Sequence, residues 1–421
     1  MTHPTSLWQT FALEMDEKRP GFAKGPWFTM NAVLTLDGEL RADVLADAFH
    51  RLQQRHEVLR TEVLDDRLQL IHPEPRSALE VVDEVGSHAP VDIGRPIRLR
   101  LAGNQLALHL HHMVSDPVTL WETVGELAAL YTATLAGEDL PPPPAQYSDY
   151  TMAEADQVRR TSADAAAWWH SRVRDAKVSP QPTTAASLTI PAAPAPAAQT
   201  APATPALAIP VSASAPAALA FRDDLLGADE VAAVEGLTRQ HRSTPLVTYL
   251  AALAHGMDEH VGPGDTLAFT TLFGKRDRPA WQRLLGPCIV PSFLAIPRVS
   301  GSLGADVTAV RDAVVGCSRY ARYPASAIYA AIQDAQRTPF FEYVPQQWPA
   351  GFTFGTVKAE VATAAGPKDT GLADGLAIRV RTRTDGVLTG HFSGDGSDWT
   401  EPLVRQVQAG FRTYLLGQEG T

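Results

Sequence analysis

Two adjacent histidines followed closely by an aspartate form the part of the sequence best suited to acid–base chemistry. These residues are His111, His112 and Asp116. A neutral imidazole, with an unperturbed pKa of about 6.5, accepts a proton near neutral pH. We therefore predict that His112 is a general base. A packed structural histidine would fit the same sequence, and Asp116 followed by Pro117 is also the pattern of a helix N-cap.

The flanking residues predict a strand that leads into a helix. Leucines alternate with other residues over Gln105–His111, which is the period of a strand. Apolar residues then recur at steps of three and four from Val118 to Tyr131, which is the period of a helix, and Gly137 follows as a stop signal. The turn between these two elements would present His112 to a cleft.

Several motifs resemble those of the condensation domains of nonribosomal peptide synthetases, which belong to the chloramphenicol-acetyltransferase-like acyltransferases. His111–Asp116 resembles the family's His-His-x-x-x-Asp-Gly motif, although Pro117 stands in place of the glycine. Arg55–Thr61 matches Arg-His-Glu-x-Leu-Arg-Thr at every fixed position, and Tyr147–Tyr150 resembles Tyr-x-Asp-Tyr. A further motif at Leu285–Leu294 is half present, because Gly286 matches the family's glycine but Val290-Pro291 stands where Asn-Thr is usual. The resemblance extends over nearly the whole chain.

This resemblance implies an α/β sandwich fold, in which two chloramphenicol-acetyltransferase-like lobes form a V-shaped pseudo-dimer with a tunnel between them. In such domains the second histidine of the motif lies at the centre of the tunnel, and here that residue is His112. Asp116 would be a structural anchor that pairs with an arginine, with Arg276 as the first candidate and Arg278 as the second. His111 would point into its own lobe and support the turn.

The same resemblance places Ser115 and Pro117 in the substrate tunnel. Proline has no backbone N–H. If the family's glycine N–H stabilises the oxyanion of the reaction, its loss would cost about 2.7–4 kcal/mol of transition-state stabilisation. If that glycine already occupies the first position of a helix, proline fits the backbone and only the N–H is lost.

A stretch without charged residues divides the sequence. Ala, Pro, Ser and Thr dominate from Val178 to Phe221, and this stretch contains no Asp, Glu, Lys or Arg. Such a segment has little to bury and a backbone stiffened by proline. We therefore predict an N-terminal acyltransferase-like lobe at 1–177, an Ala/Pro-rich linker at 178–220 and a C-terminal acyltransferase-like lobe at 221–421.

The function that the resemblance implies is the formation of an amide or ester bond in secondary metabolism of the nonribosomal peptide or polyketide type. A free-standing acyltransferase would join an acyl or peptidyl thioester on a carrier protein to an amine or hydroxyl acceptor. The phosphopantetheine belongs to the carrier, and we expect this chain to bind no cofactor of its own. Two alternatives remain open: a module that recruits a carrier protein or tailoring enzyme without catalysis, and an acyltransferase that uses coenzyme A thioesters.

The composition is that of a globular protein with small molecules and other proteins as partners. Apolar residues make up 45% of the chain, charged residues make up 20%, and the formal net charge is −11. This negative charge argues against nucleic acid or an anionic membrane as the main partner. Because the N-terminus lacks the features of an export signal and no apolar run is long enough to span a membrane, we expect a cytoplasmic protein, and a monomer.

Other residues with reactive side chains have structural explanations. Cys288 and Cys317 lack the spacing of a metal site or a CxxC motif. Cys288 lies in an apolar run and is predicted to be a core thiol. Gly394–Asp398 has part of a calcium-loop pattern, but the glutamate at the twelfth position is absent, so we predict a tight turn. We predict no metal site.

Overall fold

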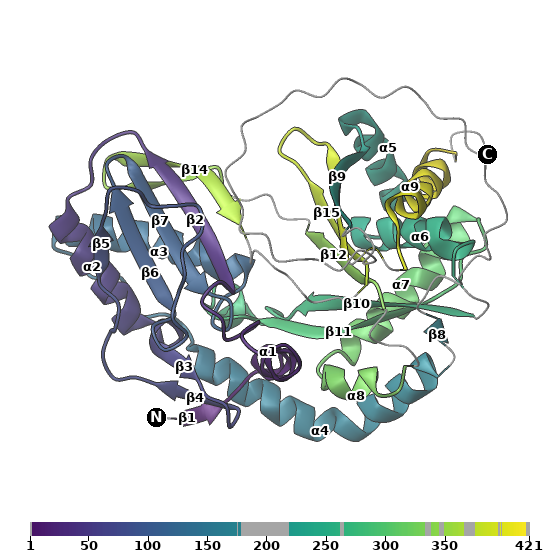
Figure 1. The fold of residues 1–421 in the computed structure, drawn as a ribbon, viewed down its shortest axis with the longest axis horizontal. Coiled ribbons are helices and arrows are strands. Elements are labelled where there is room, and N and C mark those ends of the chain that lie inside the picture. Colours follow the sequence, from purple (N-terminus) through teal and green to yellow (C-terminus); the bar gives the residue numbers. More distant parts are fainter. Residues whose placement is uncertain are drawn as a thin grey trace, which may run out of the picture.

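The computed structural model shows two lobes side by side, each built on one large sheet with helices packed against it (Figure 1). It describes residues 2–174, 176–177, 219–261, 265–332, 338–344, 349–365, 375–394, 396 and 398–417. The α/β architecture predicted from the sequence is confirmed. Most of the linker predicted at 178–220 lies outside the described residues, so the domain boundaries stay a prediction. The tunnel between the lobes also stays a prediction.

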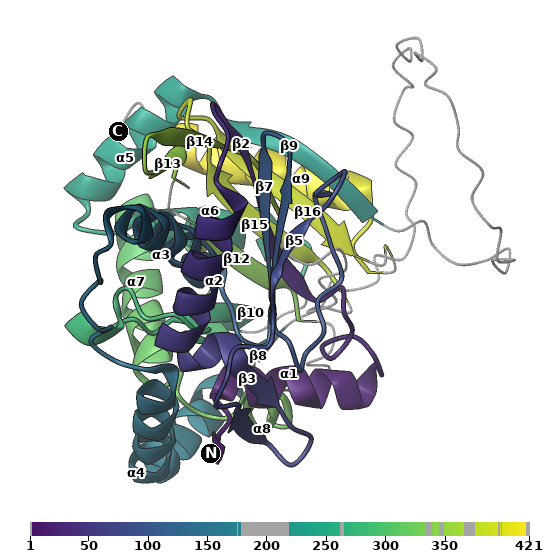
Figure 2. The same cartoon turned by 90° about the vertical axis from the view of Figure 1, so that its left-hand side faces the viewer.

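The N-terminal lobe is organised around a six-stranded sheet with the strand order β13-β14-β2-β7-β6-β5. Its strands are β2 (Thr29–Leu36), β5 (Leu79–Val81), β6 (Ile97–Ala102), β7 (Gln105–His111), β13 (Gly351–Phe354) and β14 (Val357–Ala365). Two helices, α2 (Ala42–Arg55) and α3 (Pro117–Ala136), pack against this sheet and share one apolar core with it (Figure 2). This lobe holds the histidine pair.

The central strand β7 shows how the sequence positions that pair. Leu106, Leu108 and Leu110 are buried in the core shared with α2 and α3. Ala107 belongs to a separate apolar cluster, and His109 is fully buried and bonded to a neighbouring strand. The alternation of leucine with small or polar residues therefore fits a strand that is covered on both faces, and the strand ends at the first histidine.

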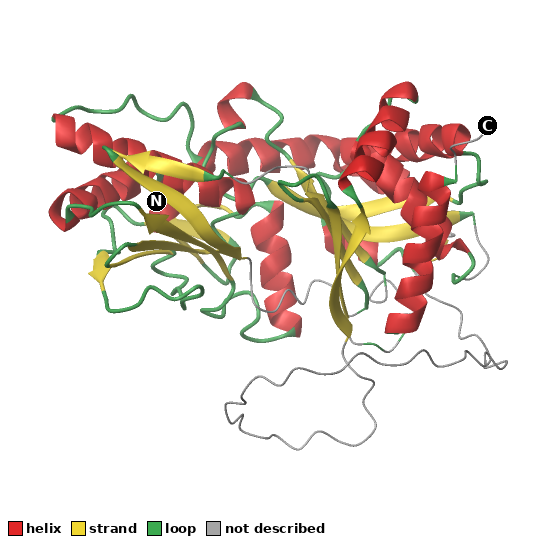
Figure 3. Cartoon of the chain, turned by 90° about the horizontal axis from the view of Figure 1, so that it is seen from above, coloured by secondary structure: helices red, strands yellow, loops and turns green. Residues whose placement is uncertain are grey.

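The C-terminal lobe contains a seven-stranded sheet with the order β11-β10-β12-β15-β16-β9, and β8 pairs with β10 off this path. The strands are β8 (Ala176–Lys177), β9 (Leu219–Leu226), β10 (Thr266–Gly274), β11 (Ile289–Pro297), β12 (Phe340–Val344), β15 (Ala377–Thr382) and β16 (Leu388–Gly394). The helices are α5 (Ala228–Gln240), α6 (Pro245–Asp258), α7 (Leu303–Arg319), α8 (Ala325–Tyr329) and α9 (Glu401–Leu416). One large core joins the helices to the sheet (Figure 3).

Two helices and one hairpin connect the lobes. The long helix α4 (Tyr147–Val173) runs beneath both of them, with Tyr150 in the core of the N-terminal lobe and Trp169 in that of the C-terminal lobe (Figure 1). Helix α1 (Leu7–Lys18) packs against β11. Strands β13 and β14 come from the C-terminal half of the sequence, yet β14 pairs with β2 and extends the N-terminal sheet. The two halves of the chain therefore share elements.

A small three-stranded sheet with the order β1-β4-β3 lies at the base of the N-terminal lobe. Its strands are β1 (Thr2–Pro4), β3 (Thr61–Val63) and β4 (Leu68–Ile71). The described residues also form two short 3-10 helices, η1 (Glu57–Arg60) and η2 (Pro279–Trp281). The Arg55–Thr61 motif lies at the end of α2, where the Arg55 guanidinium contacts the Glu126 carboxylate at 2.8 Å. No helix in the described part of the chain is both long enough and apolar enough to cross a membrane.

Candidate active site

His112 is the first residue after β7, and neighbouring elements hold its backbone. Because Thr29 of β2 lies opposite His111, Phe28 stands beside His112, and the His112 N–H donates to the Phe28 carbonyl at 2.7 Å. The indole Nε1–H of Trp8 donates to the His112 carbonyl at 2.9 Å. Helix α1 and the start of β2 thus fix the position of the His112 backbone, from which the imidazole extends.

A short hydrogen bond determines which imidazole nitrogen of His112 carries the proton. The Nδ1 atom lies 2.6 Å from the carbonyl oxygen of Ser115. A carbonyl only accepts, so Nδ1 must be the protonated nitrogen of the neutral ring, and Nε2 keeps its lone pair. Burial lowers the pKa of His112, and the Ser115 carbonyl and Asp116 only partly oppose this effect. The ring is therefore neutral near pH 7, which is the form that a base requires.

The imidazole of His112 is less open than the resemblance implies. The rings of Trp8 and Phe28 lie with their centroids 4.8 and 4.9 Å from its own. The residue is 8% exposed. These two aromatic residues were missed from the sequence, because nothing in the local pattern of α1 or β2 marks them as neighbours of a histidine so far away in the chain. They shield the base from water and restrict the approach to it.

His111 faces the interior of its own lobe, where it supports the turn. It is fully buried, and its Nδ1 accepts the N–H of Met113 at 3.3 Å. Burial lowers the pKa of His111 to about 4, against the opposing effect of the Gly25 carbonyl. Ser115 is also fully buried, and its hydroxyl donates to the His111 carbonyl at 3.0 Å. Both residues therefore shape the turn, while the placement of Ser115 in a tunnel stays a prediction.

Asp116 caps helix α3 and anchors it to the other half of the chain. Its Oδ1 accepts the backbone N–H of Thr119 at 2.7 Å, which satisfies the first turn of the helix. The guanidinium of Arg276 donates to Oδ1 at 2.7 Å and to Oδ2 at 3.0 Å, and the N–H of Cys288 donates to Oδ2 at 2.9 Å. The predicted ion pair is thus present, and it is made by Arg276. The other candidate, Arg278, lies over the ring of Trp281 at 4.2 Å.

The ion pair is almost enclosed by protein. The Asp116 side chain is 2% exposed and the Arg276 side chain is 12% exposed. Burial is the largest single influence and lowers the pKa of Arg276, but the Asp116 carboxylate and Cys288 together raise it by more, so the net change is upward. Arg276 therefore stays charged, and the pair fixes the turn that carries His112 relative to β10 and β11.

Gly286 completes this anchor, and its role was not predicted. Its N–H donates to the Thr119 hydroxyl at 3.1 Å, and its carbonyl accepts from that hydroxyl at 2.8 Å and from Arg276 at 3.1 Å. Its φ is +128°, and a Cβ there would lie 2.1 Å from the ring of Tyr147. Only glycine fits this position. The matching glycine of the half-present motif was the signal available in the sequence.

The two departures from the family pattern have simple structural consequences. Pro117 is the first residue of α3, where proline fits the helix backbone. Val290 is fully buried in the core of the C-terminal lobe, and Pro291 lies opposite Leu272 in the β10–β11 ladder. The structure therefore accommodates both changes, and the placement of Pro117 in the tunnel stays a prediction.

Other candidate sites have little support. Burial raises the pKa of the Cys288 thiol to about 12, and the side chain packs in the N-terminal core, so it is a poor nucleophile. The described residues contain no group of His, Cys, Asp and Glu suited to a metal ion. Part of the turn predicted at Gly394–Asp398 lies outside the described residues.

Parts of this chain are similar in sequence to known proteins. No family model matches the chain. The nonribosomal peptide synthetase kk1B of Curvularia clavata is 31% identical over 30% of this chain, which corresponds to 1% of that protein. The nonribosomal peptide synthetase TES of Alternaria alternata is 28% identical over 34% of this chain and 3% of that protein. The chain thus spans only a small part of the length of these relatives.

Solved structures resemble the chain over nearly its whole length. The condensation domain of the monacolin K polyketide synthase MokA has a TM-score of 0.71 at 16% identity and covers 99% of this chain and 96% of its own. SgcC5 from Streptomyces globisporus has a TM-score of 0.69 at 18% identity, with 98% and 97% covered, and the X-domain from teicoplanin biosynthesis has 0.70 at 18%, with 98% and 94% covered.

The solved structures and the sequence matches point to the same kind of domain. The chain has the fold of a condensation domain. Its sequence is related to nonribosomal peptide synthetases. The resemblance predicted from the motifs is thereby confirmed.

Proposed function

We propose that this chain is a condensation-type acyltransferase that transfers an acyl group from a carrier-protein thioester to an amine or hydroxyl, with His112 as the base. The observation that supports this most directly is the bond between His112 Nδ1 and the Ser115 carbonyl at 2.6 Å. It leaves Nε2 as the acceptor nitrogen of a neutral ring. The same tautomer logic makes a histidine effective in other acyl transfers.

The reaction then follows from the position of one proton. Nε2 of His112 takes the proton of the acceptor as its nitrogen or oxygen attacks the thioester carbonyl. The tetrahedral intermediate collapses, the C–S bond breaks, and the departing thiolate receives a proton from the imidazolium. The positive charge on the ring during this interval is opposed by burial, which the nearby Asp116 carboxylate and Ser115 carbonyl partly offset. General base catalysis of this kind contributes about two to four powers of ten in rate.

Structural neighbours give this proposal a chemical context. SgcC5 was solved with (R)-(−)-1-(2-naphthyl)-1,2-ethanediol, and a starter condensation domain of rhizomide synthetase was solved with C8-CoA and Leu-SNAC. These ligands are a diol and a thioester, the two reactant types that the proposal requires. In this chain the thioester would be carried on the phosphopantetheine arm of a partner carrier protein.

A single experiment tests the assignment of the base. The acyl-loaded carrier is incubated with candidate acceptors in three parallel reactions that contain the wild-type protein, His112→Ala or His391→Ala. Intact-mass spectrometry of the carrier then measures the loss of its acyl group. We expect His112→Ala to lower the rate of acyl loss by about two to four powers of ten. His391, a half-buried histidine of β16, is the matched control and should be near wild type. Undiminished transfer by His112→Ala would contradict the proposal.

A recruitment module is the second candidate, because His112 is only 8% exposed. One structural neighbour is a complex of the X-domain and OxyB from teicoplanin biosynthesis, so a domain of this fold binds another protein there. Calorimetric titration with the carrier and with oxygenases of the same pathway separates the two functions. Tight binding of an oxygenase without acyl transfer favours recruitment. Acyl transfer that depends on His112 favours the acyltransferase.

A further inference from the structure

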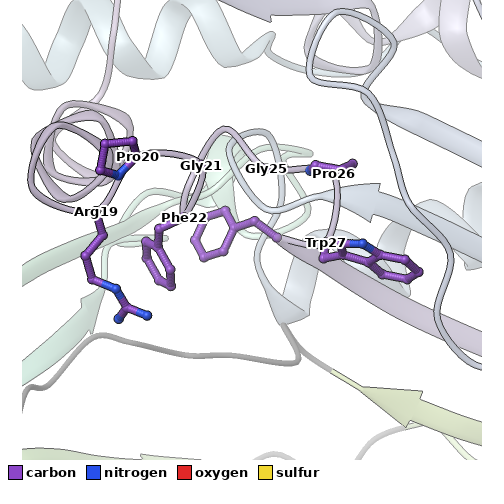
Figure 4. A pocket seen from close by; sticks show the side chains of 8 residues that line it. Arg19, Pro20, Gly21, Phe22, Gly25, Pro26 and Trp27 are labelled. Carbon is purple, nitrogen blue, oxygen red and sulfur yellow. The ribbon is translucent and has the colours of Figure 1, made fainter. Parts of the chain in front are cut away.

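The segment between α1 and β2 lines a cavity of about 590 Å³ that is open to solvent on one side. Among the described residues, its lining comes from residues between Arg19 and Phe28 (Figure 4). The volume lies within the range of about 300–1,000 Å³ that is typical of small-molecule sites. Phe28 is both a wall of this cavity and a direct neighbour of His112, with ring centroids 4.9 Å apart.

Aromatic rings dominate the wall. Phe22 lies against Phe28 with ring centroids 5.2 Å apart, and the Arg19 guanidinium lies over the Phe22 ring at 5.0 Å. Trp27 also lines the cavity and is 45% exposed, which is unusual for so large an apolar side chain. In Figure 4 the side chains of Arg19 and Phe22 extend next to each other from the same side of the segment.

The segment is held in place before any ligand binds. The buried carboxylate of Asp16 on α1 accepts the N–H groups of Ala23 and Lys24 at 2.8 and 2.9 Å. Gly25 approaches Gly21 so closely that a Cβ on it would lie 2.1 Å from the Gly21 carbonyl oxygen. The loop therefore folds tightly on itself, and its rings are positioned without a large loss of entropy on binding.

We propose that this cavity binds a flat aromatic group of one of the two substrates and places its reacting end beside His112. This inference rests on the proposed acyl transfer and specifies the substrate class. Offset or edge-to-face contacts with Phe22, Trp27 and Phe28 favour an aryl group over a saturated ring of the same size.

Matched probes separate the donor from the acceptor. Phenylacetyl N-acetylcysteamine thioester represents an aromatic donor and 2-phenylethanol an aromatic acceptor. Cyclohexylacetyl N-acetylcysteamine thioester and 2-cyclohexylethanol are their saturated counterparts. Each is titrated by calorimetry into the wild-type protein, Phe22→Leu, Trp27→Leu and the control Val81→Ala, whose exposed side chain lies on β5 at the far edge of the sheet. His112→Ala is included so that binding is measured without turnover.

We expect one aromatic probe to bind about 3- to 10-fold more tightly than its saturated counterpart, and this preference to be lost in Phe22→Leu and Trp27→Leu but kept in Val81→Ala. The probe that binds identifies whether the donor or the acceptor supplies the ring. Equal binding of saturated and aromatic probes, an unchanged preference in both leucine variants, or no binding of either aromatic probe would overturn the inference. Retained aromatic binding without acyl transfer would count against the proposed reaction alone.

Discussion

Strands β7 and β16 of this protein each lead through a short turn into a long helix, and the first of these two junctions carries the candidate base His112. Strand β7 enters α3 through residues 112–116, and β16 enters α9 through residues 395–400. Each helix has a proline in its first turn. At the first junction Asp116 caps the helix with its side chain, whereas Thr400 at the second makes no such bond.

The difference between the junctions lies in what fixes the turn. The first is held by residues from the opposite half of the chain, Arg276 and Cys288, which both donate to Asp116. At the second junction the N-cap residue Thr400 makes no side-chain bond to its helix. The first junction therefore holds its imidazole through the capping Asp116, and the short turn rather than the sheet provides this anchor.

Removal of the Asp116 carboxylate should produce the largest difference between the two junctions. Asp116→Ala leaves the buried Arg276 charge without its partner and removes the helix cap, so we expect a loss of about 3–5 kcal/mol in the free energy of unfolding. Thr400→Ala should cost about 0.5 kcal/mol or less, because Thr400 has no cap bond to lose. Urea denaturation followed by tryptophan fluorescence measures both changes.

A double variant provides the control for this prediction. Arg276→Met combined with Asp116→Ala should destabilise the protein less than the sum of the two single changes, because the isolated charge is gone. Additive losses would show that the two side chains do not interact. A cost for Asp116→Ala similar to that of Thr400→Ala would remove the distinction between the junctions.

A fall in pH should destabilise the folded state through the histidines near the first junction more than through the second junction. Burial lowers the pKa of His109 to about 3 and that of His111 to about 4, so both stay neutral in the folded protein while they titrate near 6.5 when unfolded. The unfolded state therefore binds more protons than the folded state below pH 6.5. The contribution of these two histidines to the unfolding free energy is fully present above pH 6.5 and is lost as the pH falls toward 4. For His111 alone this amounts to about 3 kcal/mol.

The pH dependence can be assigned with two matched variants. His109→Gln keeps a donor for Asn31 but does not titrate, so the slope of unfolding free energy against pH between 4 and 6.5 should become shallower. His391→Gln on β16 should change it less, because His391 is only half-buried. Chemical denaturation at a series of pH values gives the slopes. An equal effect of both variants would contradict the prediction.

The smallest effect is expected at the prolines. Pro117→Gly should lower the unfolding free energy by about 0.4–1 kcal/mol, because glycine gives the unfolded chain more freedom while the helix start is otherwise unchanged. Pro402→Gly at α9 should cost a similar amount. We expect neither to raise the rate of acyl transfer by more than about two-fold, and a gain of tenfold or more in Pro117→Gly would show that the missing N–H matters to the oxyanion.

The sequence predicted local elements and the anchor better than the surroundings of the base. The leucine alternation of β7 and the apolar period of α3 placed His112 at the right turn, since those periods record which face is buried. The family motif pointed to Arg276, and the ion pair is present. The placement of Ser115 and Pro117 in a tunnel stays a prediction.

What the sequence did not show depends on contacts between distant segments. Trp8 and Phe28 enclose His112 because α1 and β2 meet the end of β7, and no local period encodes that meeting. The contact of Gly286 with Tyr147 has the same origin. The cavity beside Phe28 depends on a tight loop whose shape is set by Asp16 and Gly25, and neither residue belongs to a motif.

The β13–β14 hairpin affects how the protein is made. Strand β2 pairs with β14, and Leu36 lies opposite Ala359. Leu36 is therefore synthesised long before its pairing partner. Until then, one edge of the N-terminal sheet is open and able to pair with a strand of another nascent chain. Slow translation of the second half should therefore increase aggregation, and a truncated product that ends before residue 351 should be a client of chaperones rather than a stable fragment.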